Sequence, residues 1–154
     1  MDRETKMITQ WFPALLQDPE FRITSPDTRD YNCIAWALGY NNRWIWPIMK
    51  AQREDDMLWF NDIEISERTE VFLQFFQSQG YRICENNDNA HGYDIIALYE
   101  LDGKVTHATR RLNNGLWTSK LGPWHDIQHS TPYSLEGNIY GKVTYILRKK
   151  ITED

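Results

Sequence analysis

Residues 104–121 read KVTHATRRLNNGLWTSKL and contain the clearest structural signal in the chain. Two runs of strand-forming residues flank Asn113-Asn114-Gly115. Asn and Gly accept the positive φ angles that tight hairpin turns require. The pattern therefore predicts two antiparallel strands, over residues 104–112 and 116–121, joined by this turn.

The length of the turn decides which side chain shares a sheet face with His107. A two-residue turn places Lys120 on that face, where a cation would oppose protonation of the imidazole. A three-residue loop, with Gly115 in the left-handed position, places Ser119 on that face and Leu121 opposite His107. The sequence is compatible with both registers.

The remaining pattern divides the chain into a helical first half and a second half of strands. The other candidate strands share an enrichment in Val, Ile, Thr and Tyr, and they cover residues 81–84, 93–99 and 138–148. Residues 123–137, between the hairpin and the last of these strands, are expected to be irregular. Turn signals separate the strands, which favours antiparallel pairing.

Two helices are expected in the first half. Residues 33–38 form a short apolar segment that Gly39 can end, and a second helix begins with Ser66 as its cap and ends at Gly80. Helices followed by strands predict an α+β fold, with N-terminal helices packed on a mostly antiparallel β-sheet. No linker interrupts the sequence, so residues 1–154 are expected to form a single domain.

Charge and hydropathy exclude several classes of function. The chain carries 17 Lys and Arg residues against 22 Asp and Glu residues, a net charge of −5, which offers no basic surface for nucleic acid or an anionic membrane. The longest apolar runs are far shorter than the ~20 residues that span a bilayer. The charged N-terminal segment lacks a signal-peptide pattern. We expect a cytoplasmic protein that binds neither nucleic acid nor membrane and needs no cofactor.

Cys33 is the strongest candidate for a reactive group. It directly follows Asn32, a potential helix cap, and the N–H groups and dipole at a helix start stabilise an anion and lower the pKa of a thiol. The alternative is that Cys33 is a small buried hydrophobe. Cys84, at the end of an apolar strand, is expected to be structural. A reducing compartment disfavours a disulfide between the two.

A cysteine nucleophile requires a base, and His107 is the best candidate because a rigid strand holds it. His125 and His129 have the spacing of a metal-binding pair on a helix, but the Glu of an HExxH motif is absent. We therefore expect no metal site and a surface or supporting role for both. The residue that orients His107 is either Ser119 or Asp126.

This arrangement resembles the papain-like thiol hydrolases, especially the compact NlpC-type cell-wall peptidases. In that group the cysteine begins a helix, the histidine begins a strand, and a third polar residue lies on the next strand. The resemblance implies a papain-like core with Cys33, His107 and Ser119 as catalytic residues. The segments YNCIAWALG (residues 31–39) and WTSKLG (residues 117–122) are also similar to motifs of a family of uncharacterised bacterial proteins.

Two functions fit these residues. The first is a cysteine-dependent amide hydrolase or acyl transferase, of the peptidase, amidase or deamidase type, that acts on a peptide or another amide-containing substrate, proteins included. In this hypothesis the backbone N–H of Cys33 and Asn32 stabilise the oxyanion, and Trp46 and Trp117 bind substrate. Delivery to another cell as a toxin or effector would use the same mechanism.

The second function is a catalytically inactive papain-like module that binds a peptide, a sugar or a protein. The chain contains seven tryptophans, and aromatic side chains are enriched in binding sites. Those expected to line an aromatic groove are Trp44, Trp46, Trp59, Trp117 and Trp124. The alternative for each is a place in the hydrophobic core.

Overall fold

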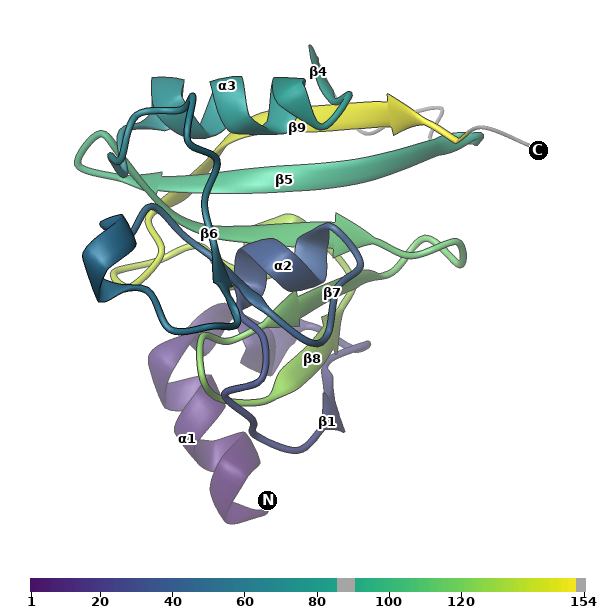
Figure 1. Cartoon of the computed structure of the whole chain (residues 1–154). Helices are drawn as coiled ribbons and strands as arrows, with labels where there is room; N and C mark the ends of the chain where they lie inside the picture. Colours follow the sequence, from purple (N-terminus) through teal and green to yellow (C-terminus); the bar gives the residue numbers. More distant parts are fainter. Residues whose placement is uncertain (86–90, 152–154) are drawn as a thin grey trace.

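The structure is a computed structural model that describes residues 1–85 and 91–151 (Figure 1). In this part of the chain, seven strands form one antiparallel sheet in the order β1-β8-β7-β6-β5-β9-β4. The strands are β1 (Arg22–Ser25), β4 (Arg82–Cys84), β5 (Tyr93–Leu101), β6 (Lys104–Arg111), β7 (Trp117–Lys120), β8 (Asp126–His129) and β9 (Lys142–Lys150). A separate parallel pair consists of β2 (Trp44–Ile45) and β3 (Met57–Leu58).

Helices cover both faces of this sheet. They are α1 (Arg3–Trp11), α2 (Cys33–Ala37) and α3 (Thr69–Ser78), with short 3-10 helices at Pro13–Gln17, Lys50–Gln52 and Pro132–Leu135. Figure 1 shows α3 along β5 and β9 and α2 across β6 and β7. The α+β class with a mostly antiparallel sheet is confirmed. In the described part, no helix has the length and apolar character that crossing a bilayer demands.

Alternation along the strands separates two cores. Ile96 and Leu98 of β5 face α2 and α3, whereas Tyr99 faces α1. We call these two sides the α2–α3 face and the α1 face. The core on the α2–α3 face includes Ile34, Phe72, Phe75, Ala108 and Leu147. The core on the α1 face includes Ile8, Phe12, Leu15, Leu121, Ile127 and Leu135.

The predicted hairpin is confirmed in its three-residue register. The Leu112 N–H donates to the Leu116 carbonyl at 2.7 Å, and Gly115 has a φ of 88°, which favours glycine. Arg110 lies opposite Thr118, and continuing this register places Ser119 on the same face as His107. Lys120 therefore lies on the other face of the sheet.

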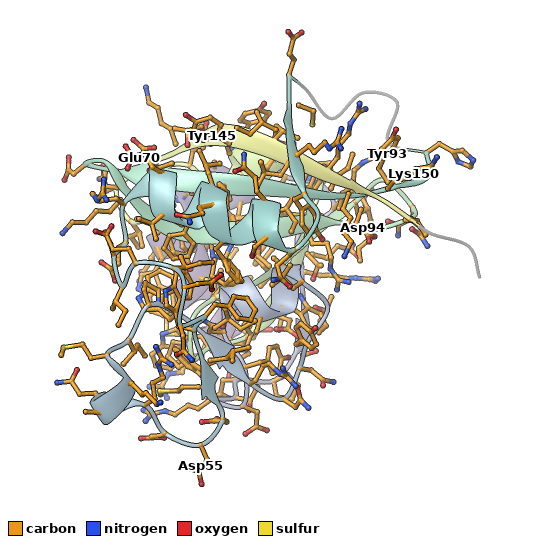
Figure 2. The ribbon with its side chains drawn as sticks, turned by 45° about the horizontal axis from the view of Figure 1, so that its top comes forward. Asp55, Glu70, Tyr93, Asp94, Tyr145 and Lys150 are labelled. Atoms are coloured by element: carbon orange, nitrogen blue, oxygen red, sulfur yellow. The ribbon has the colours of Figure 1, made fainter. Side chains whose placement is uncertain are left out.

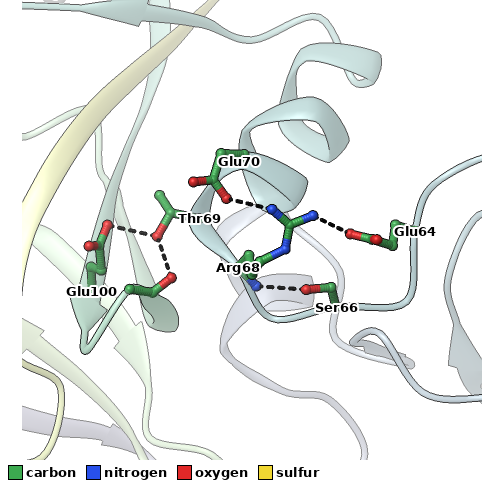
Figure 3. Close-up of polar contacts among 7 residues, drawn as sticks. Glu64, Ser66, Arg68, Thr69, Glu70 and Glu100 are labelled. Atoms are coloured by element: carbon green, nitrogen blue, oxygen red, sulfur yellow. Dashed lines mark hydrogen bonds and ion pairs between the residues drawn. The ribbon is translucent and has the colours of Figure 1, made fainter.

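The second predicted helix begins later than the sequence indicates. Ser66 is not its cap: the Ser66 Oγ accepts the Arg68 N–H at 3.1 Å, and α3 starts at Thr69. The Thr69 hydroxyl donates to the Glu100 carboxylate at 2.7 Å, which ties the helix start to β5, and Arg68 pairs with two flanking glutamates (Figure 3). The predicted end is confirmed, because Gly80 follows the helix with a φ of 95°.

Two strands of the seven-stranded sheet were not predicted, and neither was the separate pair of β2 and β3. β8 lies within residues 123–137, which were expected to be irregular, and β1 lies in the supposedly helical first half. Each has four residues, and they pair with one another at the edge of the sheet. β9 also begins at residue 142 instead of 138, because a bridge between Gly137 and Gly141 closes a tight loop before it.

β5 and β9 form a long pair whose far end is polar. Tyr93 lies opposite Lys150, and Figure 2 shows both side chains near Asp94 at this end. The Arg148 guanidinium lies over the Tyr93 ring, 4.4 Å from its centroid. Residues 148–150 are exposed, so the basic end of β9 is in solvent and away from the candidate site on β6.

Candidate active site

Asn32 caps α2 and fixes the helix against the parallel strand pair. Its Oδ1 accepts the Ala35 N–H at 3.2 Å and the Ile45 N–H at 3.1 Å, and its Nδ2 donates to the Ile45 carbonyl at 2.9 Å. The predicted cap is confirmed. Because these contacts make Asn32 a structural residue here, its role in an oxyanion site remains a prediction.

Cys33 occupies the first position of α2 and is only 7% exposed. Burial raises the pKa of its thiol from 9.0 to about 11, although the N–H groups of Ala108, Ile34 and Cys33 itself and the charge of Lys120 lower it. The expected net lowering by the helix start is therefore wrong for this conformation. Desolvation outweighs the N–H groups, so the thiol is protonated at neutral pH.

The Ala108 N–H that reaches Cys33 lies on the edge of β6 that faces β7. The Leu112 N–H points toward β7, where it meets the Leu116 carbonyl, and N–H groups at even spacing along a strand point the same way. The β6–β7 ladder stops at Arg110. The Ala108 N–H, which a regular ladder would have directed to β7, thus lowers the pKa of the Cys33 thiol instead.

His107 lies on the α1 face of β6, opposite Tyr99 of β5, and is fully buried. Its ring stacks on Tyr140 with centroids 4.2 Å apart and an interplanar angle of 4°. Its Nε2 lies 3.1 Å from the Ser119 Oγ, whereas Nδ1 has no hydrogen-bond partner among the described residues. Desolvation and then the electrostatic interaction with His129 lower the pKa of His107 well below 6.5, so the ring is neutral at pH 7.

Cys33 and His107 therefore approach the same stretch of β6 from opposite faces of the sheet. Cys33 packs with Ala108 in the core of the α2–α3 face, and His107 lies among the aromatic rings of the α1 face. In the described residues, no hydrogen bond joins the sulfur to either imidazole nitrogen. Both groups lie next to Ala108, where β6 forms no ladder with β7.

Ser119 is the centre of a buried polar chain on the α1 face. Its Oγ lies 2.7 Å from the Thr109 Oγ1, 2.9 Å from the His129 Nε2 and 3.1 Å from the His107 Nε2. The other nitrogen of His129, Nδ1, lies 2.8 Å from the Thr131 carbonyl oxygen. Desolvation lowers the pKa of His129 to about 4. Ser119 thus contacts the ring that the three-residue register predicts it to contact.

Asp126, the alternative orienting residue, lies on the α2–α3 face, away from His107. Its Oδ2 accepts a hydrogen bond from the Tyr31 hydroxyl at 2.6 Å, and desolvation raises the pKa of its carboxyl group. Lys120 lies opposite Asp126, and its Nζ donates to the Thr28 carbonyl at 2.8 Å. Asp126 and Lys120 therefore anchor the segment before α2, and the expectation that Asp126 orients His107 is wrong.

His125 and His129 do not share a helix face, because His129 ends β8 and His125 immediately precedes it. The part of the chain that the structure describes contains no group of three or more His, Cys, Asp or Glu side chains able to hold a metal ion. No pattern in the sequence indicated that His129 contacts Ser119. Only a sequence pattern that predicted the strand β8 could have placed His129 beside Ser119.

The tryptophans expected to bind substrate belong to the hydrophobic packing. Trp117 is 1% exposed and packs with Ile95 and Ile146 on the α1 face. Trp46 donates its Nε1 hydrogen to Glu67 at 2.8 Å on the other face, and it packs against Phe72. Because the two side chains lie on opposite faces of the sheet, they do not share one surface, and a role of either in binding substrate stays a prediction.

A different aromatic cleft lies beside the His107 ring. Tyr140, which stacks on His107, also lines this cleft, and Trp11 and Trp124 face each other there with centroids 5.7 Å apart. Its volume is about 280 Å³, and its remaining lining residues are Phe12, Leu121, Gly122, Pro123 and Ile139. Trp124 is 42% exposed, so the cleft opens to solvent at that residue.

Cys84 lies on β4, with its sulfur 3.5 Å from the Ile146 carbonyl oxygen, and is only partly buried. It is remote from the polar chain on β6 and β7, since β4 is the last strand at the opposite end of the sheet from β8. The candidate site therefore contains Cys33 as its cysteine.

The comparisons with known proteins identify a family. Residues 22–148 match the family model described as "Domain of unknown function (DUF7689)". The chain belongs to the DUF7689 family. The match extends from β1 through most of β9 and includes all the residues of the candidate site. No curated protein and no solved structure matches this DUF7689 chain.

Proposed function

We propose that this DUF7689 protein is a cysteine-dependent amide hydrolase with a papain-like core, in which Cys33 attacks a carbonyl carbon and His107 receives the thiol proton. One observation supports it most. The Cys33 sulfur and the His107 ring flank the same stretch of β6, which pairs with β5 but has no ladder to β7, and the His107 Nδ1 is buried without a partner among the described residues. A buried nitrogen without a hydrogen bond commonly lowers the free energy of unfolding by about 1–3 kcal/mol. Because the fold retains this nitrogen at such a cost, a functional role is a reasonable explanation for it.

Catalysis would begin by opening the buried site. Solvent or substrate that reaches the sulfur removes the desolvation that raises the pKa of Cys33. The N–H groups of Cys33, Ile34 and Ala108 and the charge of Lys120 then favour the thiolate. Proton transfer to the His107 Nδ1 yields the nucleophile, which forms a thioester with a peptide or other amide and releases an amine that takes the proton back. Water then hydrolyses the thioester and regenerates the Cys33 thiol. We place this reaction in the cytoplasm.

A second candidate function is a non-catalytic binding module, and the burial of Cys33 favours it. A thiol that is 7% exposed, with its pKa raised to about 11, has the properties of a structural core residue. In this case the cleft between Trp11 and Trp124 would be the binding surface.

Alkylation by iodoacetamide distinguishes the two functions. In a Cys84→Ser background, Cys33 is the single thiol, and its labelling in the native protein is followed by intact mass. The hydrolase requires His107 as a base, so we expect His107→Asn to slow labelling at least tenfold. The binding module exposes Cys33 only by unfolding, and a destabilising His107 substitution would then accelerate labelling. Unchanged or faster labelling overturns the hydrolase.

The denaturant dependence of labelling provides a test that needs no His107 variant. If native fluctuations expose a reactive Cys33, its labelling rate stays nearly constant in low urea. If labelling requires global unfolding, the logarithm of the rate rises linearly with urea, with the slope of equilibrium unfolding. The second result would contradict the hydrolase even if His107→Asn failed to fold.

A further inference from the structure

We infer that Lys120 is a further catalytic residue, whose ammonium group stabilises the oxyanion that forms when the Cys33 sulfur adds to a carbonyl carbon. The inference rests on the proposed function. The sequence predicted that the Cys33 N–H and Asn32 would stabilise this oxyanion. The Asn32 side chain, however, binds backbone groups of Ala35 and Ile45 through both of its polar atoms, so a charged donor elsewhere in the site is of interest.

Lys120 is a buried cation without an ion pair. It is 0% exposed, and its Nζ donates to the carbonyl oxygens of Thr28 at 2.8 Å and Gly122 at 2.5 Å. Asp126, which lies opposite Lys120 on β8, binds the Tyr31 hydroxyl, and no carboxylate forms an ion pair with Lys120 in the described part of the chain. Burying a charge without a counter-ion is unfavourable. A negative charge that forms beside Lys120 is therefore stabilised strongly.

Lys120 and Cys33 lie against the same stretch of β6. Continuing the register of β6 and β7 by two residues brings Lys120 level with Ala108, on which Cys33 packs. The Lys120 ammonium lies over the Tyr31 ring, 5.1 Å from its centroid, and Tyr31 is two residues before Cys33 in the chain. In agreement with this arrangement on the α2–α3 face, the charge of Lys120 acts on the Cys33 thiol and the charge of Cys33 acts on Lys120.

The ammonium group of Lys120 has a hydrogen to spare. It carries three hydrogens, and the carbonyl oxygens of Thr28 and Gly122 accept two of them. No third hydrogen bond of Nζ exists among the described residues, so one hydrogen remains for an oxygen that arrives with substrate. The two carbonyls also hold the ammonium between the segment before α2 and the turn after β7. A donor that is held in place in this way stabilises an oxyanion without reorganising during the reaction.

The reaction assigns separate tasks to Lys120 and His107. The Cys33 sulfur bonds to the carbonyl carbon, and the electron pair of the carbon–oxygen π bond moves to the oxygen, where Lys120 stabilises the charge. When the pair returns, the carbon–nitrogen bond breaks and the amine leaves with the proton that His107 took from the thiol. Lys120 keeps its own protons throughout. Alkylation by iodoacetamide releases iodide and forms no oxyanion, so it does not require this contribution.

The test compares two reactions of Cys33 at one pH in the Cys84→Ser background. Acylation by p-nitrophenyl acetate passes through an oxyanion, and alkylation by iodoacetamide does not. Both reactions require the thiolate and an open site, so changes in either cancel from the ratio of the two rate constants. The release of p-nitrophenolate by protein that also carries Cys33→Ser is subtracted.

We expect Lys120→Met to lower the ratio of acylation to alkylation about 100-fold, as is common when one oxyanion donor is removed. Lys104→Met is the control, because Lys104 is exposed, and it should leave the ratio unchanged. The titratable groups that face Lys120 come from α2, from β8 and from the segment before α2, and they are Cys33, Asp126, Tyr31, Asp27 and Asp30. Measuring both reactions at the same pH keeps the charges of these groups the same in the two rates.

An unchanged ratio in folded Lys120→Met would overturn the inference and leave the His107-dependent hydrolase intact. Such a result would mean that Lys120 only holds the two segments together. If the ratio falls but the alkylation of Cys33 does not depend on His107, the role of Lys120 stands and the assignment of the base fails. If native Cys33 is not acylated at all, the hydrolase and the role of Lys120 fail together.

A crystal structure of the Cys84→Ser protein treated with acetaldehyde provides a test that needs no Lys120 variant. The Cys33 thiol adds across the aldehyde carbonyl, so that sulfur bonds to carbon, the hydrogen goes to oxygen, and a hemithioacetal oxygen occupies the place of the oxyanion. We expect this oxygen within about 3.2 Å of the Lys120 Nζ. An adduct oxygen directed to another donor, or no adduct at Cys33, would overturn the inference even if Lys120→Met did not fold.

Discussion

The backbone N–H of Ala108 lowers the pKa of the Cys33 thiol at a position where the ladder between β6 and β7 is open. The side chain at the start of α2 thus packs on a part of β6 that forms no ladder with β7. The consequence is an opening between two strands, flanked by Cys33 on the α2–α3 face and by the His107 ring on the α1 face. The proposed chemistry requires that the proton of the Cys33 thiol reach the His107 Nδ1 through this opening.

Cys33 should make the protein sensitive to alkaline pH. The pKa of its thiol is 9.0 without burial and about 11 in the fold, so the unfolded chain loses the proton first and stability falls as pH rises between these values. The full loss amounts to about 2–3 kcal/mol. We expect Cys33→Ser to lose less stability than wild type between pH 9 and pH 11 in urea titrations. Cys84→Ser is the matched control and should behave as wild type.

His129 should contribute to acid sensitivity. Its pKa lies at about 4 in the fold and 6.5 in the unfolded chain, so stability is fully present above pH 6.5 and declines as pH falls toward 4. This one group accounts for a decline of about 3 kcal/mol. His129→Gln should flatten the decline by that amount in urea titrations at the two pH values. An equally steep decline in the variant would show that His129 is not buried in its neutral form.

The hairpin was predictable from the sequence, but its register was not, and the polar chain around it was only partly predictable. A three-residue loop with Gly115 in the left-handed position places Ser119 on the face of His107, whereas a two-residue turn would have placed Lys120 there. The three-residue register also implies that Thr109 lies opposite Ser119. The part of the site that depends on one hairpin was therefore one of two alternatives in the sequence, and the structure selects between them.

The remainder of the site depends on long-range packing that no local pattern encodes. β8 has only four residues, alternates polar and apolar side chains with His129 at its end, and lies between Pro123 and Pro132, which argue against regular structure. Burial of Cys33 depends on how α2 packs against β6, which a five-residue helix signal does not specify. Position at a helix start alone therefore predicted the wrong direction for its pKa shift.

The Tyr31 hydroxyl should be important for stability, because it donates to the buried Asp126 carboxylate at 2.6 Å. The other Asp126 oxygen, Oδ1, has no hydrogen-bond partner among the described residues. Tyr31→Phe would remove a donor from a carboxylate that is already short of them, at a cost of about 1–3 kcal/mol. Tyr133→Phe is the control, since Tyr133 is 57% exposed. Equal urea midpoints for the two variants would contradict the structural role of Tyr31.

Gly141 should tolerate no side chain. A Cβ added there would lie 2.0 Å from the Glu100 carbonyl oxygen, a backbone atom that cannot move aside cheaply. Gly103 has the same φ of 79° but nothing within 4 Å of its Cβ position. The two Gly→Ala substitutions thus share the strain of a positive φ and differ in the clash. We expect Gly141→Ala to destabilise the protein by about 1–3 kcal/mol more than Gly103→Ala.

The position of Gly141 gives this substitution a second readout. Gly141 follows Tyr140, whose ring covers His107 and whose carbonyl accepts a hydrogen bond from the Thr106 hydroxyl at 2.6 Å. Displacing the backbone at Gly141 should move the Tyr140 ring and weaken the aromatic signal in near-ultraviolet circular dichroism, whereas Gly103→Ala should leave that signal intact. If both variants kept the wild-type spectrum and equal stability, the close approach of Gly141 to β5 would be refuted, and with it the view that this loop fixes the cover over His107.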